Sequence, residues 1–344
     1  MLEKDVGEPF IHRLRLIVLL EADFNMALRL IWMKRLFCNA EADGFVAEQW
    51  GNRKDKSAMD CLTMKLLTCE SVRIMRHRAA LMAMDAAACY DRIITYLSNI
   101  SERRYGLPKN ACKTKGSAIF EMKRHVRTAF GDSAHFYTST DNDLMHGECQ
   151  GKTSSPPSWT IFTITLLRAL KHYNPGIQIE SVDGSVTIQR VADMFVDDCD
   201  LWTSLPPDSS EEDLVKRFTI AAQSWERLLF ATGGLLALHK CYWWFITWDW
   251  ENEMPVPRQS KTDEFSVELS NGNDEVSVPI TRLELHESNV GLGFRLSPNG
   301  SQQREFHHRL SLSDRIAEKV NASSLNSSDA WVFYNSIYVR VFFG

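Results

Sequence analysis

The chain has 344 residues, of which 44% are hydrophobic and 24% are charged, so it has enough apolar material for one large core or two modest ones. Its formal net charge of -5 excludes the overall basic balance of many nucleic-acid-binding proteins. Any such contact therefore has to come from local basic clusters. These lie at 53–56, 73–78 and 103–115, and such runs are more often solvated faces than binding surfaces.

The cysteine pattern and the N-terminus predict where the protein is found. The eight cysteines are scattered and no two have C-x-x-C spacing, which argues against a zinc ribbon and predicts reduced thiols. Acidic residues precede the apolar part of 1–20, unlike a signal peptide, and no apolar run reaches the ~20 residues of a membrane helix. We expect an intracellular protein, nuclear or cytoplasmic, that is not secreted and has no membrane partner.

The first elements are predicted from apolar spacing. Residues 16–20 look extended and a helix follows to Phe37. A basic loop starts near Glu48 and ends at Ser57, a plausible cap for a helix that runs to about Met75.

A buried strand over 79–84 is predicted to place Asp85 at its end. A carboxylate at this edge of a sheet is often functional, although Asp is also a favoured helix cap. The next apolar residues lie at helical spacing and predict a helix directly afterwards: Cys89, Ile93, Leu97 and Ile100. A second amphipathic helix is predicted over 117–130.

Two hairpins are predicted in the middle of the chain. A polar loop over 147–159 leads into an apolar helix over 160–173, and Asp183-Gly184 is a strong turn signal between two strands. Asp197 and Asp198 then interrupt an apolar run at 192–202, so we expect them at the tip of the second hairpin. A turn lets adjacent carboxylates serve one metal site, although Asp-Asp is common in turns without metal.

The C-terminal part is predicted to contain a long helix over 211–231 and an aromatic segment over 235–250. The tryptophans of that segment fit a sheet core better than a base-stacking surface. A polar stretch over 251–274 suggests a domain boundary, and short strands near 276–280 and 290–296 precede helices over 303–320 and 329–341.

Several motifs occur in one order. Asp85 is followed by Tyr90-Asp91-Arg92, Gln150-Gly151 is followed by Ser155-Pro156, and Phe195-Val196-Asp197-Asp198 comes next. Gly233-Gly234 then precedes Lys240, while Gly51-Asn52-Arg53 and Arg15-Leu16-Ile17 lie upstream. In this order the motifs resemble those of reverse transcriptases, with closest likeness to the non-LTR and group II intron branch. The likeness covers about Arg15 to Trp250, with Phe195 where Tyr is commoner and Leu16 where Pro is expected.

The resemblance implies an α+β right-hand polymerase with a palm of antiparallel sheet packed on helices, helical fingers and a partial helical thumb. The implied fingers are 1–78, the palm is 79–250 with 101–131 returning to the fingers, and 251–344 forms a connector and truncated thumb. The implied partners are an RNA template, a DNA primer and dNTPs. Other retroelement domains are expected to be missing from this chain.

The resemblance also implies roles for single residues. Asp85, Asp197 and Asp198 are the expected ligands of two Mg²⁺ ions, which Mn²⁺ could replace, and Lys240 is the expected fourth catalytic residue. The remaining expected residues bind the dNTP, with Tyr90 also excluding ribonucleotides by a steric clash: Ala86, Tyr90, Gln150, Gly151, Arg53 and Arg15.

Two alternatives stay open. One is an inactive retroelement remnant that binds nucleic acid without polymerising it, although all three carboxylates, Gln150 and Lys240 are present. The other is a different palm-type nucleotidyl transferase, such as a nucleotide cyclase.

Overall fold

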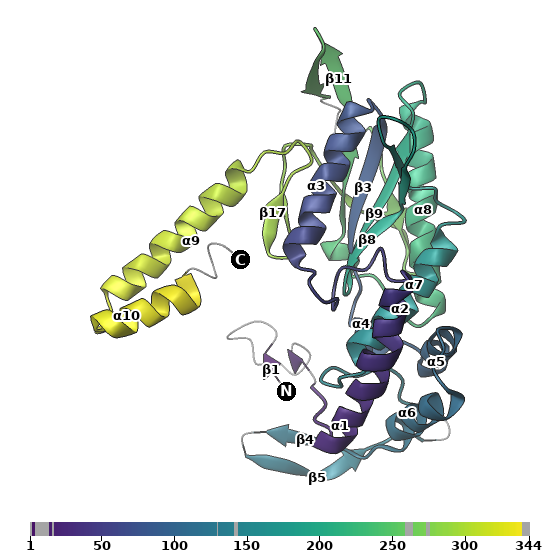
Figure 1. Cartoon of the computed structure of the whole chain (residues 1–344), viewed down its shortest axis with the longest axis vertical. Coiled ribbons are helices and arrows are strands. Elements are labelled where there is room, and N and C mark those ends of the chain that lie inside the picture. The colour runs from purple at the N-terminus through teal and green to yellow at the C-terminus, as the bar shows by residue number, and fades with distance from the viewer. Residues whose placement is uncertain are drawn as a thin grey trace.

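A computed structural model describes residues 2–3, 14–15, 17–128, 130–140, 144–258, 264–272 and 276–338 (Figure 1). Its centre is one five-stranded sheet between layers of helix, so the expected α+β class is confirmed. The strands follow in this order across the sheet: β15 (Thr281–Leu283), β10 (Tyr242–Ile246), β3 (Arg78–Asp85), β9 (Asp198–Leu205) and β8 (Ala192–Phe195).

The sheet is mixed, which corrects the antiparallel sheet expected from the sequence. Neighbouring strands from β10 to β8 run antiparallel, but β15 pairs with β10 in parallel. The two expected hairpins, around Asp183-Gly184 and over 192–202, are confirmed. The first consists of β6 (Ile177–Glu180) and β7 (Thr187–Arg190), and the second of β8 and β9.

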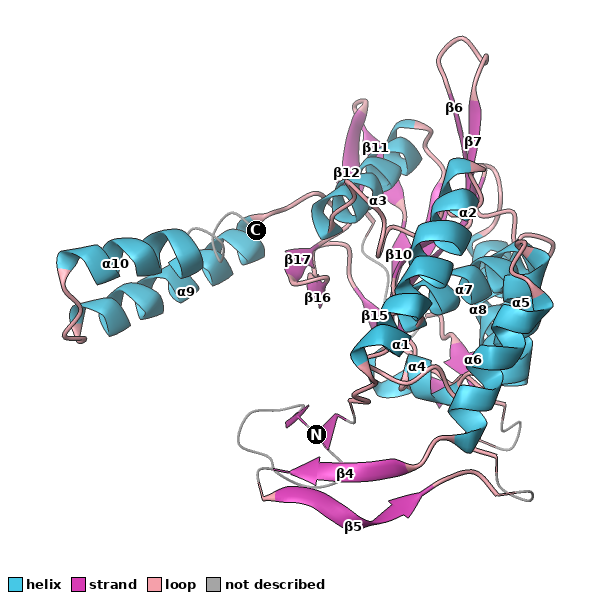
Figure 2. Ribbon diagram, turned by 60° about the horizontal axis from the view of Figure 1, so that its bottom comes forward, coloured by secondary structure: helices cyan, strands magenta, loops and turns pink. Residues whose placement is uncertain are grey.

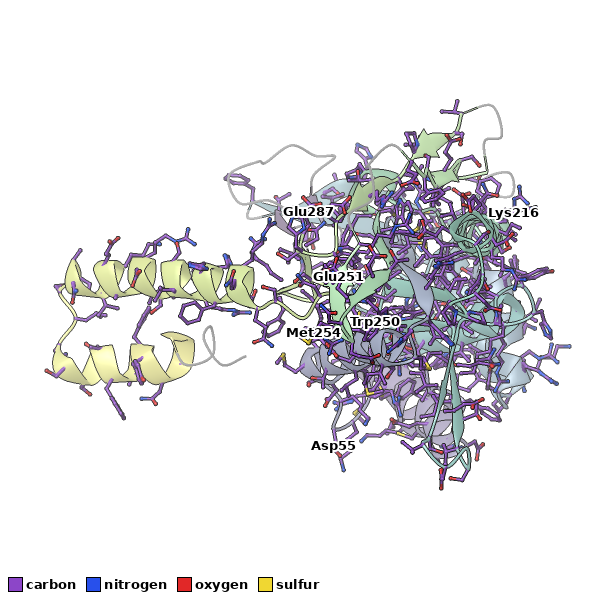
Figure 3. The ribbon with its side chains drawn as sticks, turned by 90° about the horizontal axis from the view of Figure 1, so that it is seen from above. Asp55, Lys216, Trp250, Glu251, Met254 and Glu287 are labelled. Atoms are coloured by element: carbon purple, nitrogen blue, oxygen red, sulfur yellow. The ribbon has the colours of Figure 1, made fainter. Side chains whose placement is uncertain are left out.

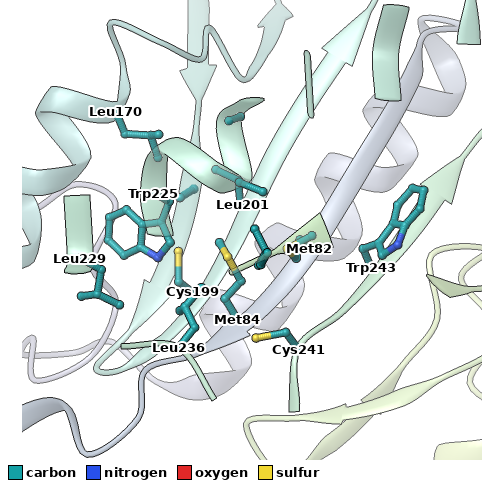
Figure 4. Close-up of a cluster of buried hydrophobic side chains, with 14 of the residues drawn as sticks. Met82, Met84, Leu170, Cys199, Leu201, Trp225, Leu229, Leu236, Cys241 and Trp243 are labelled. Carbon is teal, nitrogen blue, oxygen red and sulfur yellow. The ribbon is translucent and has the colours of Figure 1, made fainter. Parts of the chain in front are cut away.

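Helices cover both faces of the sheet because its central strands are apolar on both sides. One face carries Met82 and Met84 and packs against α7 (Ser155–Leu170) and α8 (Glu211–Ala231). Figure 4 shows this cluster, in which Trp225 of α8 lies near Cys199 and Leu201. The opposite face is covered by α3 (Ala58–Ile74), which packs on Leu81, Trp202 and Trp244.

The long helices begin where the capping residues predict. Ser57 accepts a hydrogen bond from the Asp60 backbone N–H, and the Asp60 carboxylate accepts from Ser57, so α3 starts with a complete capping box. Ser210 caps α8 by accepting from the Asp213 N–H, and three acidic residues follow in the first turn, where the helix dipole favours them. The bounds predicted for these two helices are therefore confirmed within one residue.

A second layer of helices lies beyond α7 (Figures 1 and 2). It starts with a nearly continuous helical segment made of α1 (Ala22–Leu28), the π-helical η2 (Arg29–Phe37) and α2 (Cys38–Ala42). The helices α5 (Thr95–Arg104) and α6 (Lys109–Glu121) complete the layer.

Two helix predictions between Asp85 and Phe130 were wrong in part. The helix predicted directly after Asp85 is split into the one-turn α4 (Cys89–Arg92) and α5, because Ala88 has a left-handed conformation and Ile93 is extended. Ile100, on α5, is exposed. The helix predicted over 117–130 ends at Glu121, and β4 (Arg124–Thr128) then pairs with β5 (Gly131–Tyr137). Ile119 is buried, but Met122 and Val126 are only half-buried and Phe130 is fully exposed, so spacing alone could not maintain a helix beyond Glu121.

The C-terminal region contains small hairpins and a helical arm. The hairpins pair β11 (Trp248–Glu251) with β12 (Met254–Pro257), β13 (Glu268–Leu269) with β14 (Val278–Pro279), and β16 (Asn289–Gly291) with β17 (Phe294–Leu296). Figure 3 shows Trp250 and Met254 on the first hairpin.

The arm projects from the body and consists of α9 (Gln303–Asn321), α10 (Ser327–Phe333) and the π-helical η4 (Tyr334–Tyr338) (Figures 2 and 3). A short strand pair, β1 (Leu2–Glu3) with β2 (Leu14–Arg15), lies at the N-terminus. Among the described helices, none has the length and apolar character needed to cross a membrane.

Candidate active site

Three aspartates lie at one end of the sheet, which is where the sequence predicted them. Asp85 is the last residue of β3 and Asp198 is the first of β9, and the two lie directly opposite each other in the antiparallel register. Side chains opposite each other in such a pair point to the same face. Asp197 precedes Asp198 in the turn between β8 and β9.

Lys240 reaches the same end of the sheet from the short 3₁₀ helix η3 (Leu238–Lys240). The glycine turn after α8 sends the chain back along the segment that follows β3, where the Ala87 N–H donates to the Leu235 carbonyl and the Ala237 N–H donates to the Asp85 carbonyl, each at 2.8 Å. This places the Lys240 Nζ 2.6 Å from the Asp85 Oδ2.

The carboxylates raise one another's proton affinity. Burial, followed by the charge of Asp85, raises the pKa of Asp197. Asp198 is partly accessible to solvent. Desolvation of its carboxylate, followed by the negative charges of Asp197, Asp200 and Asp85, nevertheless raises its pKa to about 7. The hydrogen bond to Asp85 raises the pKa of Lys240, which stays a cation. The cluster therefore has more negative charge than Lys240 neutralises.

A cavity of about 390 Å³ opens beside this cluster. Asp85, Asp198 and Lys240 line one side of it, and the hairpin of β16 and β17 contributes Asn289 and Gly291 on another. Asp85, Asp198 and Lys240 therefore border a cavity whose wall also includes residues of the C-terminal region.

Lys65 and Asp200 also line this cavity, and sequence reasoning did not find them. The Lys65 Nζ lies 2.7 Å from the Asp200 Oδ1, both side chains are largely buried, and the ammonium lies 5.4 Å from the centre of the Trp244 ring. The available signal was a lysine on the apolar side of α3 opposite a carboxylate two residues after Asp198, and it is visible only once the sheet register is known.

Tyr90 lies on the other side of the Asp197 turn. The Cys89 thiol donates to the Asp197 Oδ2 at 3.8 Å, and the Tyr90 ring meets Trp159 edge to face with centroids 6.1 Å apart. Burial raises the pKa of the Tyr90 hydroxyl well above its ordinary value, so it is protonated at neutral pH.

The loop that contains Gln150 and Gly151 packs against the N-terminal segment. The Gln150 carbonyl accepts from the Val18 N–H at 2.7 Å. Gly151 has φ +100°, and a Cβ there would lie 2.5 Å from the Val18 carbonyl oxygen, so the close approach requires glycine. The loop is joined to the first motif because the Glu148 N–H donates to the Tyr90 carbonyl at 2.5 Å.

A buried network of ion pairs holds the Gln150 loop in place. The Lys115 Nζ lies 2.6 Å from both Glu102 Oε1 and Glu148 Oε1, the Lys152 Nζ lies 3.0 Å from Glu148 Oε2, and Ser158 donates to Glu102. The two lysines, through charge and hydrogen bonds, outweigh burial and lower the pKa of Glu148 to about 2. The network joins α5, α6 and the start of α7.

The remaining expected residues lie outside this cluster. Ala86 is buried and forms a β-bridge with Leu236. Arg53 forms an ion pair with Glu41 and donates to the Gln49 carbonyl, and it does not line the cavity beside Asp85. The side chain of Arg15 lies outside the described residues.

The donor set fits a hard divalent cation, because carboxylate oxygens are the ligands that Mg²⁺ prefers and their mutual repulsion is relieved by a cation. Within the part of the chain that the structure describes, no three His, Cys, Asp or Glu side chains already converge as a ligand cluster. The ligands would have to include groups besides these side chains, and Mg²⁺ usually keeps waters and shares substrate phosphates.

Comparison with known proteins gives distant likeness only. No protein-family model and no curated protein matches the sequence. Among solved structures, Candida tropicalis telomerase with a fragment of telomeric RNA is 14% identical, with a TM-score of 0.44 over 62% of this chain and 32% of that one. The apo C. tropicalis telomerase truncated from its C-terminal domain gives 0.44 at 14% identity over 71% and 42%, and Candida albicans telomerase gives 0.42 at 14% over 63% and 35%.

The chain spans about a third to two fifths of the length of these structures. Because these likenesses are partial and distant, they carry no argument about function. A function can be inferred only from the residues of this chain and their arrangement.

Proposed function

We propose that this chain is the polymerase core of a retroelement reverse transcriptase of the non-LTR type. It copies an RNA template into DNA by adding dNTPs to the 3′-hydroxyl of a primer. The observation that carries the proposal is that Asp85, Asp198 and Lys240 lie together at one end of the central sheet, with Asp197 in the adjoining turn. The ordered motifs around them support it.

In this proposal the palm is 79–250 and contains the sheet with α7 and α8. The fingers are 1–78, to which α5 and α6 return within 101–131. Residues 251–344 are the connector and the thumb, of which the arm of α9 and α10 is the helical part.

Asp85, Asp197 and Asp198 are the residues that would bind Mg²⁺, or Mn²⁺ in its place. Two such ions, when bound, would activate the primer 3′-hydroxyl and neutralise the charge that develops on the departing pyrophosphate. The excess negative charge of the cluster provides the attraction for them. Lys240 stays protonated beside Asp85, so its Nζ can donate a proton or a hydrogen bond to a phosphate oxygen.

Tyr90 and the Gln150 loop are proposed to bind the nucleotide. Trp159 packs on Tyr90 and limits the space around its ring, which supports a role in excluding a sugar with a 2′-hydroxyl. The Gln150 loop is anchored by buried charge pairs, as expected for a loop that has to present backbone groups in a fixed position.

Extension of a labelled DNA primer on an RNA template with dNTPs and Mg²⁺ or Mn²⁺ tests this function. We expect extension by the wild type and loss of at least 100-fold in Asp197→Ala. Equal extension by both proteins would show a contaminant and reject the site. A product formed from nucleoside triphosphate alone would identify a cyclase-like enzyme, and tight template binding without extension would identify an inactive remnant.

A further inference from the structure

The residue before the Asp197-Asp198 pair has an unusual backbone. Val196 has φ +61°, in the left-handed region that β-branched residues rarely adopt. Such a conformation persists only where the surrounding structure imposes it. Because Val196 directly precedes both carboxylates, the groups that fix its backbone also fix where Asp197 and Asp198 point.

A buried glutamine side chain binds both polar groups of Val196. The Gln49 Oε1 accepts from the Val196 N–H at 2.9 Å, and the Gln49 Nε2 donates to the Val196 carbonyl at 3.3 Å. The indole N–H of Trp159 donates to the same carbonyl at 2.6 Å. Gln49 is fully buried, so water does not replace these bonds. The side-chain amide takes the place that a neighbouring strand would occupy.

The main chain around Gln49 is anchored on both sides. The Met194 N–H donates to the Glu48 carbonyl and the Trp50 N–H donates to the Met194 carbonyl, each at 2.8 Å, so 48–50 forms a short parallel extension of the sheet beside β8. The Trp50 indole N–H also donates to the buried Asp193 carboxylate at 3.1 Å. The Gln49 amide therefore approaches the turn from a fixed position.

Gly51 shows how closely this segment approaches the turn. A Cβ at Gly51 would lie 2.7 Å from the Val196 backbone nitrogen and 2.7 Å from its Cγ2. The nitrogen is a main-chain atom and cannot rotate away. Any larger residue at Gly51 would have to displace the turn or the segment itself.

We propose that Gln49 is a positioning residue for the Asp197-Asp198 pair: its amide fixes Val196 in the left-handed conformation and so sets the geometry of the carboxylates. This inference rests on the proposed polymerase function for its catalytic consequence. The structural part, the imposed conformation of Val196, does not depend on it.

The main variant is Gln49→Met, which keeps the length and apolar bulk of the side chain. It removes both hydrogen bonds to Val196 and also the one that the Gln49 Oε1 accepts from the Gly51 N–H at 3.1 Å. Gln189→Ala is the matched control, because Gln189 also donates from its side-chain amide to a backbone carbonyl, that of Pro175, but on the exposed hairpin of β6 and β7. We expect Gln49→Met to lower kcat for single-nucleotide addition 10- to 100-fold with a change in the dNTP KM below threefold. Gln189→Ala should match the wild type.

Rescue distinguishes positioning from general damage to the fold. Glycine adopts a positive φ without steric cost, so in a Val196→Gly background the turn needs less support. In the Val196→Gly background, we expect Gln49→Met to lower kcat by less than threefold. An unchanged kcat in Gln49→Met, or a full 10- to 100-fold loss in the Val196→Gly background, would overturn the inference.

Hydrogen exchange measured by mass spectrometry on peptides within 191–205 gives a readout without polymerase activity. Faster exchange at Val196 and Asp197 in Gln49→Met than in Gln189→Ala is expected, and equal exchange would overturn the inference. If Gln49→Met does not fold, Gly51→Ala tests the same contact with the Gln49 amide intact, and unchanged exchange and kcat there would reject it. If the wild type extends no primer, the proposed function fails, whereas exchange still decides the role of Gln49.

Discussion

The Lys240 ammonium lies 2.6 Å from an Asp85 oxygen at the rim of a cavity, with a side chain that is 44% exposed. A charged group in that position can contact an incoming phosphate without a large rearrangement. Lys240→Met keeps most of the aliphatic stem and removes the charge. We expect kcat for nucleotide addition to fall about 10²-fold, within the range for loss of a general acid.

The control for this change is Lys216→Met, a lysine on α8 that is exposed and outside the cavity lining; Figure 3 labels it at the edge of the body. Its kinetics should match those of the wild type. Equal activity of Lys240→Met and Lys216→Met would remove Lys240 from the catalytic set.

Tyr90→Ala tests the steric exclusion of ribonucleotides. The ring packs edge to face on Trp159, so its removal leaves space beside the Asp197 turn. We expect the preference for dNTPs over ribonucleotides, measured as the ratio of kcat/KM values, to fall at least 10-fold. Tyr90→Phe keeps the ring and should keep the preference. A preference that is unchanged in Tyr90→Ala would reject this role.

Prediction from sequence worked for residues whose signal is local. Asp85 and the Asp197-Asp198 pair follow apolar runs that read as strands, so their place at strand ends could be foreseen. Gln49 and Lys65 could not be found in this way, because a single polar residue in a loop or on a helix has no periodic signal. Their partners are 147 and 135 residues away in the chain, and only the folded sheet brings them together.

At the scale of elements, Glu148 makes the comparable contacts. Its carboxylate joins the Gln150 loop to α6 through Lys115 and also binds Lys152 of the same loop. Glu148→Gln removes the negative charge and leaves Lys115 and Lys152 buried with less compensation. We expect the free energy of unfolding at pH 7, measured by urea denaturation, to fall by about 3–5 kcal/mol. The control is Asp132→Asn, which breaks the exposed ion pair between Asp132 of β5 and Arg127 of β4 and should change the free energy of unfolding little.

The same network predicts a pH dependence of stability. The pKa of Glu148 is lowered to about 2 in the folded chain, below the value near 4.3 of an unfolded chain. Its contribution is therefore fully present above about pH 5 and is lost as the pH falls toward 2, an effect of about 3 kcal/mol. The stability difference between wild type and Glu148→Gln should shrink over this range. A difference that is constant from pH 6 to pH 3 would contradict the assignment.

Element predictions succeeded or failed according to what lies beneath each segment. The helix over 211–231 has capping residues and an apolar face that meets the sheet, so caps and spacing agree with packing. The segment over 117–130 has helical spacing too, yet its second half extends past the edge of the helical layer and forms β4, which pairs with β5. Apolar spacing shows which face could be buried, and only the tertiary structure shows whether a partner is there.

At the scale of the whole molecule, the arm of α9 and α10 is the part that contributes least to the core. Ser313 is the one buried residue of α9, and Phe306, Leu310 and Trp331 are exposed. We expect a chain that ends at Ser301 to fold with its melting temperature lowered by less than about 5 °C. If the arm is the thumb, its affinity for primer–template should fall, measured by fluorescence anisotropy. Unfolding of the shortened chain would contradict an arm that is separate from the core. Unchanged affinity for primer–template would contradict its role as the thumb.

The central property of the proposed polymerase is that the RNA template base selects the nucleotide that is added. Single-nucleotide incorporation measures this most directly, with four RNA templates that differ only in the first unpaired base and with each dNTP supplied alone in Mg²⁺. We predict that the wild type adds only the complementary nucleotide on each template and that Asp197→Asn adds none. Addition independent of the template base, or equal addition by Asp197→Asn, would contradict the account.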